Sequence, residues 1–376
     1  MSSFAAASVA QLATAARRCR SRTPDEPTAR ERLASLAKPP GSLGTLEDWA
    51  AVLCAAQQTL RPAADPASVL VFCGDHGVKK ADDGLSPFPP SVSQAVFRAL
   101  AAGVSATAVL ARAAGAHLTV VDVGLDGDVR DARARAGARV AVRHAKVARG
   151  TADMRAAAAM DEGAFERALQ AGRDCVAGEV AARGARVVAI GEAGIGNTTA
   201  AAAVLCALSR ADPAECVGRG TGLDDAGVRH KAQAVRDACA FHAAALPDAP
   251  AARAREALRR LGGLELAAMA GAYEAAARAG VVAVVDGFIS AVAALCAARM
   301  HPACRATMVF ATGLAEEPSS RRGGELLEAA LDAKPALAMG LRLGEASGAA
   351  LALPLLRAAA AVVGEMGTLA EALALG

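Results

Sequence analysis

Five short apolar runs, rich in β-branched residues, stand out from an alanine-rich background: residues 68–73, 117–123, 186–190, 281–285 and 308–311. Each run is continuous rather than alternating, which is typical of strands buried on both faces of a sheet. Most of them end in Gly or Asp and lead into helix-forming sequence. This repetition predicts right-handed βαβ units, and therefore an α/β fold with a parallel sheet covered by helices.

The two ends of the chain contain no such runs. Residues 1–60 are typical of helix, interrupted at 38–41 by Lys-Pro-Pro-Gly, and residues 340–376 are typical of helix with a glycine-rich start. Neither end has a strand-rich core of its own. We therefore expect 1–60 and 340–376 to pack together as a small helical domain beside a large α/β domain formed by 61–339. In a parallel sheet, functional groups are expected in the loops at the carboxyl ends of the strands.

Composition narrows the class of protein. With 54% hydrophobic and 21% charged residues, the chain can bury a large core, which excludes a disordered protein. A net charge of +3, with both signs mixed along the chain, gives no indication of nucleic-acid binding. The nine cysteines contain no CxxC pair, which argues against a disulfide framework or structural zinc and favours a reducing cytoplasm.

No membrane span is expected either. Asp286 interrupts the apolar stretch at 281–299, and Pro354 and Arg357 interrupt the one at 349–363. The sequence therefore predicts a soluble, cytoplasmic protein.

Residues 191–199, GEAGIGNTT, follow a predicted strand and open an alanine-rich helix. Free N–H groups at the helix start, together with the hydroxyls of Thr198 and Thr199, could hold a phosphate. The same spacing also describes an ordinary tight turn with a threonine cap. Glu192 favours the functional interpretation, because a carboxylate beside an anion-binding loop is unfavourable unless it has a role or a cationic partner.

Residues 218–227, GRGTGLDDAG, contain three alternate glycines that allow a ligand to approach the backbone closely. Asp224 or Asp225 is expected to cap the helix that follows. Lys231 lies about two turns into this helix, where a solvated lysine is the usual interpretation. It becomes a candidate only if its face of the helix turns toward Glu192.

Single acidic residues and one histidine follow other predicted elements. Glu345 stands between glycines ahead of an apolar helix, where it either stabilises the helix dipole or, desolvated against an apolar wall, acts as a general base. Asp286 ends the fourth predicted strand and either caps a helix or faces a ligand. His76 ends the first, either as a proton carrier or as a structural histidine bonded to Asp75 or to backbone.

Taken in order, seven segments resemble the nicotinate-nucleotide–dimethylbenzimidazole phosphoribosyltransferase family. They are KPPGSLGTLED (38–48), CGDHGV (73–78), GEAGIGNTT (191–199), GRGTGLDDAG (218–227), LGGLELAAMAGA (261–272), VVDGFIS (284–290) and GLRLGEASGAALALPLL (340–356). No single segment is decisive, but together they extend over most of the chain and are highly specific.

The resemblance implies a Rossmann-like parallel sheet with a helical domain from both chain ends, working as a homodimer without cofactor or metal. The implied reaction transfers phosphoribose from nicotinate mononucleotide to dimethylbenzimidazole, giving α-ribazole 5′-phosphate for the lower ligand of cobalamin. The family's catalytic base falls on Glu345. The implied benzimidazole pocket comprises Glu192, Lys231, Ser86 and Phe88, and the implied nucleotide and phosphate site comprises Gly194, Gly196, Asn197, Thr198, Gly220 and Asp286.

The chain departs from the family pattern at three places. A Ser-Ala-Glu run usually follows the fifth strand, but residues 312–318 read TGLAEEP, so phosphate contacts are expected from the backbone instead of the serine. Phe88 stands where an aromatic hydroxyl is common, and Ala346 replaces a common glycine. These changes leave an alternative open, namely a non-catalytic nucleotide-binding protein on the same fold. A nucleotide hydrolase is a third possibility and ranks last, because the sequence has no arrangement of residues that would activate water in preference to an aromatic nitrogen.

Overall fold

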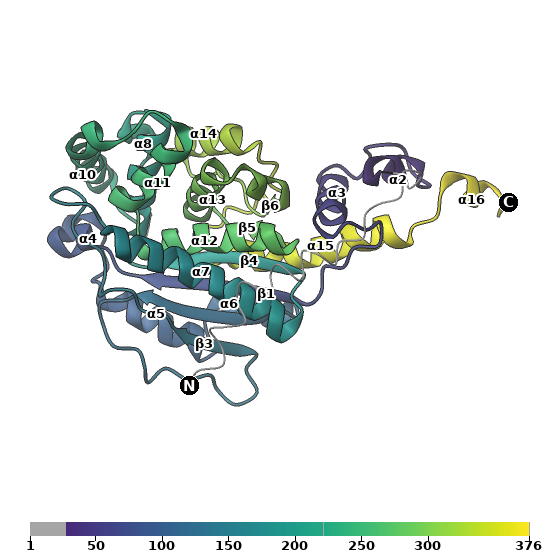
Figure 1. Ribbon diagram of the computed structural model, residues 1–376, viewed down its shortest axis with the longest axis horizontal. Coiled ribbons are helices and arrows are strands. Elements are labelled where there is room, and N and C mark those ends of the chain that lie inside the picture. The colour runs from purple at the N-terminus through teal and green to yellow at the C-terminus, as the bar shows by residue number, and fades with distance from the viewer. Residues whose placement is uncertain (1–27, 221, 376) are drawn as a thin grey trace.

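A computed structural model describes residues 28–220 and 222–375. Its centre is a six-stranded sheet in the order β3-β2-β1-β4-β5-β6, in which every neighbouring pair is parallel (Figure 1). This is the strand order of the doubly wound Rossmann fold, so the predicted fold class is confirmed. The strands are β1 (Ala67–Gly74), β2 (His117–Gly124), β3 (Val140–His144), β4 (Val187–Ala193), β5 (Val282–Val285) and β6 (Met308–Phe310).

All five predicted runs form strands, but β3 was not predicted. It pairs only with β2 at the edge of the sheet and its residues are half-buried or exposed. Because one side of this strand is open to solvent, it carries Arg143 and His144 and shows no continuous apolar run.

Helices connect the strands and cover both faces of the sheet. They are α2 (Ala29–Ser35), α3 (Thr45–Gln57), α4 (Gly77–Ala81), α5 (Ser91–Ala101), α6 (Ala106–Ala113), α7 (Glu162–Arg183), α8 (Asn197–Ser209), α9 (Pro213–Cys216), α10 (Asp225–His242), α11 (Pro250–Leu261), α12 (Leu264–Ala279), α13 (Phe288–Met300), α14 (Arg321–Leu331), α15 (Ser347–Glu365) and α16 (Leu369–Leu373).

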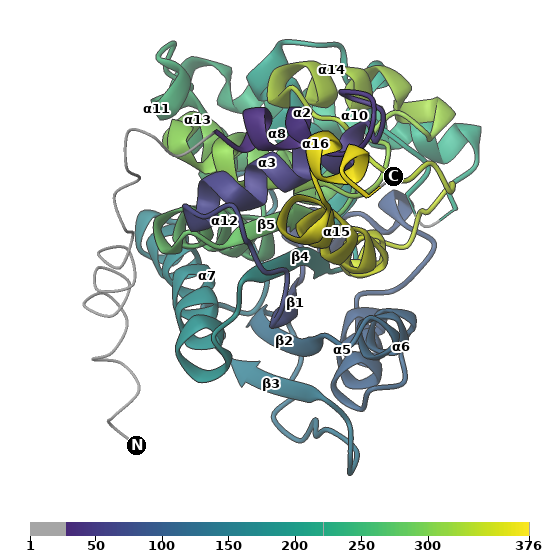
Figure 2. The ribbon, with the colours of Figure 1, turned by 90° about the vertical axis from the view of Figure 1, so that its right-hand side faces the viewer.

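Alternate residues of the strands enter two separate cores. In β1, Leu70 and Phe72 join the core that includes α7, α8, α11, α12 and α13, whereas Val69 and Val71 join the core that includes α3, α5, α6 and α15. Figure 2 shows α7 and α12 on one side of the sheet and α5, α6 and α15 on the other. A strand buried on both faces must be apolar at every position, which is why the runs could be recognised.

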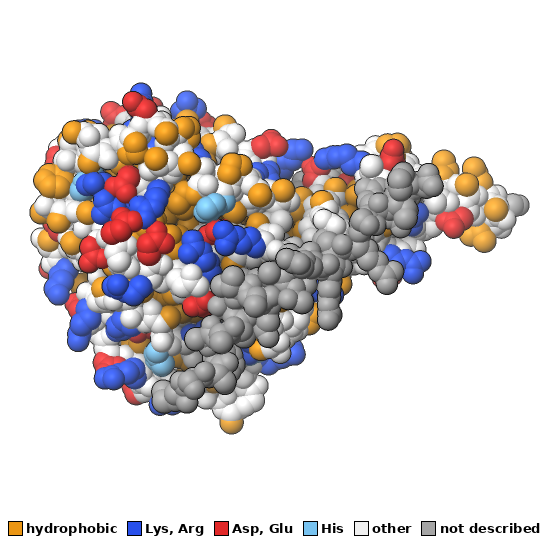
Figure 3. All heavy atoms as spheres, in the orientation of Figure 1, with side chains coloured by type: hydrophobic (Ala, Val, Ile, Leu, Met, Phe, Trp, Pro, Cys, Tyr) orange, Lys and Arg blue, Asp and Glu red, His pale blue; other side chains and the backbone are white. Residues whose placement is uncertain are grey.

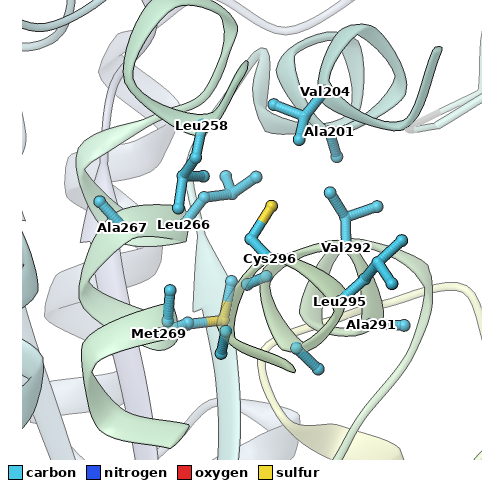
Figure 4. Close-up of a cluster of buried hydrophobic side chains, with 14 of the residues drawn as sticks. Ala201, Val204, Leu258, Leu266, Ala267, Met269, Ala291, Val292, Leu295 and Cys296 are labelled. Atoms are coloured by element: carbon cyan, nitrogen blue, oxygen red, sulfur yellow. The ribbon is translucent and has the colours of Figure 1, made fainter. Parts of the chain in front are cut away.

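Small side chains let the helices pack closely. A Cβ atom added at Gly172 of α7 would lie 1.7 Å from the carbonyl oxygen of Ala268 in α12, so the two helix backbones are nearly in contact. Where α8, α11, α12 and α13 meet, alanine and valine alternate with larger residues such as Leu258, Met269 and Leu295 (Figure 4). The alanine-rich composition therefore serves a dense helical layer.

Helices from both ends of the chain lie side by side. Arg32 of α2 donates a 2.7 Å hydrogen bond to the carbonyl of Met366, and Leu36 forms a β-bridge with Thr368. Figure 1 shows α2, α3 and α16 around the far end of α15. However, α15 also contacts β4 and α6, so the division into 1–60 with 340–376 and 61–339 stays a prediction. Residues 1–27 of that expected domain lie outside the described residues.

Two stretches of the described chain, Ser91–Ala113 and Ser347–Glu365, are long and apolar enough to cross a membrane. The first is broken between α5 and α6, where Gly103 has a φ of +76°. The second is α15, which continues through Pro354 and Arg357 instead of being interrupted there, and half of it is buried. Both pack against the sheet layers, as core helices of globular proteins do, so their length alone is weak evidence for a membrane span.

Charge and cysteine chemistry are spread through the molecule. On the face shown in Figure 3, acidic and basic side chains are interspersed. Each cysteine in the described part of the chain has a free thiol, and most of these thiols are buried. Within the same residues, no cluster of His, Cys, Asp or Glu could hold a metal ion.

Candidate active site

A cavity of about 1110 Å³ opens at the carboxyl ends of β4, β5 and β6. Its wall is built by the segments that follow these strands, by the loop that precedes α15 and by one face of α5. This is where a doubly wound sheet binds its ligands. Of the predicted site residues, the following line it: Phe88, Glu192, Gly194, Asn197, Thr198, Gly220, Asp286 and Glu345.

The turn that carries Glu345 lies directly against the end of β4. The amide of Glu345 donates a 3.1 Å hydrogen bond to the carbonyl of Glu192. A Cβ atom at Gly344 would lie 2.8 Å from Oε1 of Glu192, and one at Gly191 would lie 2.2 Å from the amide nitrogen of Ala346. Glycines at these two positions therefore allow the turn and the strand to come together.

The backbone at this turn is left-handed over three consecutive residues. The φ angles are +75° at Gly344, +58° at Glu345 and +62° at Ala346. Only the first of these is a residue that adopts such angles freely. The unfavourable backbone angles of Glu345 and Ala346 persist because the turn is fixed at both sides, by β4 and by the start of α15.

Glu345 is half-buried, and its carboxylate lies near Thr107 of α6, whose hydroxyl is 3.5 Å from Oε2. Burial raises the pKa of the Glu345 carboxyl, and the long hydrogen bond from Thr107 opposes this effect. The direction agrees with the expectation from the apolar helix that follows. A carboxylate with a raised pKa is a better proton acceptor at neutral pH.

Glu192 is more deeply buried, at 4% exposure, and accepts a hydrogen bond from the side-chain amide of Asn197. Its pKa is raised well above the usual range by burial and then by the negative charges of Glu265, Asp286 and Glu345. These effects favour the protonated acid. Glu192 and Glu345 are hydrogen-bonded through their backbones but differ in burial. Two acids in such different environments can take different roles, one as a proton acceptor and the other as a neutral acid.

Asp286 caps α15 from the end of β5. Its Oδ1 accepts a 2.8 Å hydrogen bond from the amide of Ala349, and its backbone carbonyl accepts one of 2.6 Å from the hydroxyl of Thr312. Burial raises the pKa of Asp286 to about 7, against the lowering effect of the α15 amides. Asp286 therefore does not cap the helix that follows it, α13, but caps α15. It also lines the cavity, and its contact with a ligand stays a prediction.

Lys231 does not itself line the cavity, and its expected place in the benzimidazole pocket stays a prediction. Because α10 packs against α8, its ammonium lies behind the wall, 2.6 Å from the hydroxyl of Thr198 and 3.3 Å from the carbonyl of Gly218. Burial lowers the pKa of Lys231 to about 8. Its charge supports the loops around Thr198 and Gly220 instead of Glu192.

Ser86 and Gly196 are also outside the cavity wall. The Ser86 hydroxyl accepts a 3.2 Å hydrogen bond from the amide of Phe88, and so shapes the turn that presents Phe88, which is 43% exposed. Gly196 caps α8 with a φ of +103° and packs on His76 and Lys79, where a Cβ atom would come within 3.0 Å of each. The Thr199 hydroxyl is buried without a hydrogen-bond partner among the described residues and does not line the cavity.

His76 pairs with Glu265, and not with Asp75 or backbone as the sequence suggested. Its Nε2 lies 2.8 Å from Oε1 of Glu265, and both side chains are almost completely buried. The pKa of His76 is raised: burial alone would lower it, but the charge and hydrogen bond of Glu265 outweigh that effect. Glu265 lies within a segment quoted for the family resemblance, but nothing in its spacing indicated this pair.

Other residues at the site also escaped the sequence analysis. The hydroxyl of Ser93 in α5 accepts a 3.0 Å hydrogen bond from the amide of Ile195, which ties α5 to the turn after β4. Thr107 and Ser93 lie in helices without a motif. Their roles arise only from the packing of α5 and α6 beside β4.

Comparison with known proteins identifies the family of the chain. A family model described as Phosphoribosyltransferase matches residues 22–373. A nicotinate-nucleotide–dimethylbenzimidazole phosphoribosyltransferase of Pseudomonas aeruginosa strain PAO1 is 48% identical over 344 residues, covering 92% of each chain. That of Pseudomonas putida strain KT2440 is 46% identical over 345 residues, again covering 92% of each.

Solved structures from Thermus thermophilus show the same fold. A structure titled as CobT superimposes with a TM-score of 0.82 at 38% identity, covering 92% of this chain and 97% of the other. A second one, titled as the phosphoribosyltransferase, gives 0.80 at 38% identity with 92% and 96% coverage. The chain belongs to the nicotinate-nucleotide–dimethylbenzimidazole phosphoribosyltransferase family.

Proposed function

We propose that this chain transfers phosphoribose from nicotinate mononucleotide to dimethylbenzimidazole, releasing nicotinate and giving α-ribazole 5′-phosphate, with Glu345 as general base. The observation that carries this proposal is the position of Glu345, half-buried in the cavity wall and hydrogen-bonded through its amide to Glu192. Family membership supports the reaction, and the geometry supports the assignment of the base.

The reaction needs a proton acceptor but no proton donor. One ring nitrogen of the benzimidazole forms a bond to C1′ of the ribose, while the bond from C1′ to the pyridinium nitrogen breaks and its electron pair stays on nicotinate. The other benzimidazole nitrogen then carries a proton that must leave. A carboxylate within hydrogen-bond distance of that N–H accepts it, and this is the role assigned to Glu345.

Glu192 is proposed to orient the base and not to share the proton. Its raised pKa keeps the acid neutral, so it adds no negative charge beside an anionic nucleotide and can donate a hydrogen bond. With Phe88 exposed at the cavity wall, the pocket offers an aromatic face for a flat heterocycle.

The nucleotide is proposed to lie across the start of α8 and the loop at Gly218–Gly220. Asn197 and Thr198 begin α8 in the cavity wall, where the positive end of the helix dipole favours an anion. The buried ammonium of Lys231 stands behind Thr198. Holding both substrates in line supplies much of the rate enhancement.

Replacement Glu345→Gln tests the role of the base. It keeps the shape and removes the proton acceptor, so we expect kcat to fall by about 10²- to 10⁴-fold, as for other general bases. Equilibrium binding of nicotinate mononucleotide should change little. Glu365→Gln, on the exposed far end of the helix that follows, is the matched control. Turnover that survives in Glu345→Gln would remove this residue from the mechanism.

One assay distinguishes the proposed transferase from the alternative, a catalytically impaired nucleotide-binding protein. The wild-type chain is incubated with both substrates and nicotinate release is followed. Release that depends on dimethylbenzimidazole supports transfer. Binding of nicotinate mononucleotide without release supports the alternative.

We also propose a homodimeric, soluble, cytoplasmic enzyme, which the resemblance to the family and the free thiols support.

A further inference from the structure

The loop after β6 places a carboxylate on hydrogen-bond donors of residues that line the cavity. Oε1 of Glu317 accepts hydrogen bonds from the backbone amide of Arg219 and from the hydroxyl of Ser319, the latter at 2.7 Å. The Arg219 amide also lies 3.2 Å from the Ser319 hydroxyl. All three residues line the cavity. One carboxylate thus occupies the hydrogen-bond donors of two loops that enclose the site.

The surroundings of Glu317 form a donor set suited to an anion. Its carboxylate lies against Gly218, where a Cβ atom would come within 2.7 Å of Oε1. Behind Gly218 stands the buried ammonium of Lys231, which is 3.3 Å from the Gly218 carbonyl and also bonded to Thr198. A backbone amide, a hydroxyl and a nearby cation are the groups with which proteins bind phosphate.

Glu317 has no salt bridge of its own among the residues that the structure describes. The guanidinium of Arg219 is turned outward to Asp225 and to the carbonyl of Leu223, the latter at 2.9 Å. The neighbouring Glu316 also holds two cavity-lining amides, those of Gly313 at 3.1 Å and Gly340 at 2.6 Å. Glu317 differs in that its donors, the Arg219 amide and the Ser319 hydroxyl, lie beside Gly218, whose carbonyl is bonded to the ammonium of Lys231.

We propose that Glu317 is a built-in competitor for the phosphate of the nucleotide: it holds the Arg219 amide and the Ser319 hydroxyl, and the substrate phosphate takes these donors when the side chain swings away. Glu317 is only half-buried, so it can move toward solvent. The residue thereby sets the affinity for the nucleotide without touching the reacting atoms. This inference rests on the proposed function, in which the nucleotide lies beside Gly218–Gly220.

The variant Glu317→Gln keeps an oxygen that accepts from the Arg219 amide but removes the charge. We expect the KM for nicotinate mononucleotide to fall about tenfold, since the phosphate then displaces a neutral amide instead of a charged carboxylate from the Arg219 amide and the Ser319 hydroxyl. The KM for dimethylbenzimidazole should stay close to the wild-type value. Glu325→Gln, exposed on α14, makes the same charge change outside the cavity and serves as the control.

Binding of inorganic phosphate gives a readout that does not need turnover. Titration calorimetry should show phosphate binding about tenfold tighter to Glu317→Gln than to wild type and to Glu325→Gln. Equal or weaker binding would overturn the proposal and leave Glu317 as a fastener of the loop. If Glu317→Gln does not fold, as judged by its melting curve, Glu317→Ala replaces it with the same expected and contrary results.

The two proposals fail in different ways. Absence of nicotinate release by the wild-type chain contradicts the proposed function, and phosphate binding still tests Glu317. Normal release with unchanged phosphate affinity in the variant contradicts only the role of Glu317.

Discussion

At the scale of single residues, the site depends on side chains held in places that the backbone does not favour. A non-glycine residue in the left-handed region costs about 1–2 kcal/mol, and Glu345 and Ala346 are two in succession. The turn is held by the Glu345 amide on Glu192 and by the Asp286 cap on Ala349. Strain of this kind persists where a precise position of a functional group is needed.

Asp286 should make the protein less stable as the pH rises. Its pKa is raised to about 7 in the folded protein, whereas an unfolded aspartate titrates at about 4. Between these values the unfolded chain has lost a proton that the folded chain retains. The free energy of unfolding therefore falls with rising pH and levels off above about 7.

The variant Asp286→Asn removes this titration and keeps an oxygen for the amide of Ala349. The difference in melting temperature, variant minus wild type, should therefore increase between about pH 5 and about pH 8. The exposed Asp248→Asn is the control, with a difference that stays constant. A constant difference for Asp286→Asn as well would contradict the raised pKa.

At the scale of elements, the environment of Glu345 is assembled from parts far apart in the sequence. The end of β4 positions its backbone, α15 begins behind it, and α6 supplies the hydroxyl near its carboxylate. The position of α6 therefore bears on the pKa of the proposed base, which the hydrogen bond from Thr107 lowers.

Removal of the hydroxyl in Thr107→Val should raise the pKa of Glu345 further, because the hydrogen bond from Thr107 lowers it. The acidic limb of the profile of kcat/KM against pH should then move to higher pH. On that limb we expect a loss of about twofold to tenfold, the worth of one hydrogen bond. Thr107→Ser keeps the hydroxyl and should retain the wild-type profile. Identical profiles for Thr107→Val and wild type would show that α6 has no influence on the base.

An element could be predicted where its burial is visible in the sequence as a run of apolar residues. The five strands buried on both faces were recognised as continuous apolar runs, whereas β3 was not, because its open edge admits Arg143 and His144. Residues directly after the predicted apolar runs, such as Glu192 and Asp286, could be placed at one edge of the sheet because parallel strands end there together.

The rest of the site depends on how helices pack, which spacing along the chain does not encode. Lys231 was placed correctly on its helix, but only the packing of α10 on α8 turns its ammonium to Thr198 instead of Glu192. The pair of His76 with Glu265 joins residues far apart in sequence, and Thr107 contacts Glu345 across a similar gap. Such contacts are set by tertiary structure.

At the scale of the whole molecule, helices from both ends of the chain meet on α15, so the loop that carries Glu345 is anchored by the sheet on one side and the terminal helices on the other.

The proposed homodimer has a direct measurement. Light scattering of the full chain after gel filtration should give twice the 37.5 kDa of one chain. The mass should persist on dilution, because stable dimers bury large apolar areas. A mass of one chain at all concentrations would contradict the dimer.

The left-handed turn at Gly344–Ala346 also has a consequence for evolution in the laboratory. Glycine at position 345 would relieve the backbone strain and leave the fold intact, but it would remove the proposed base, so thermal stability and activity favour different residues at this position. A library screened for thermal stability alone would therefore be enriched in stable but inactive variants. Directed evolution of this enzyme for thermal stability must therefore include an assay of product formation in every round.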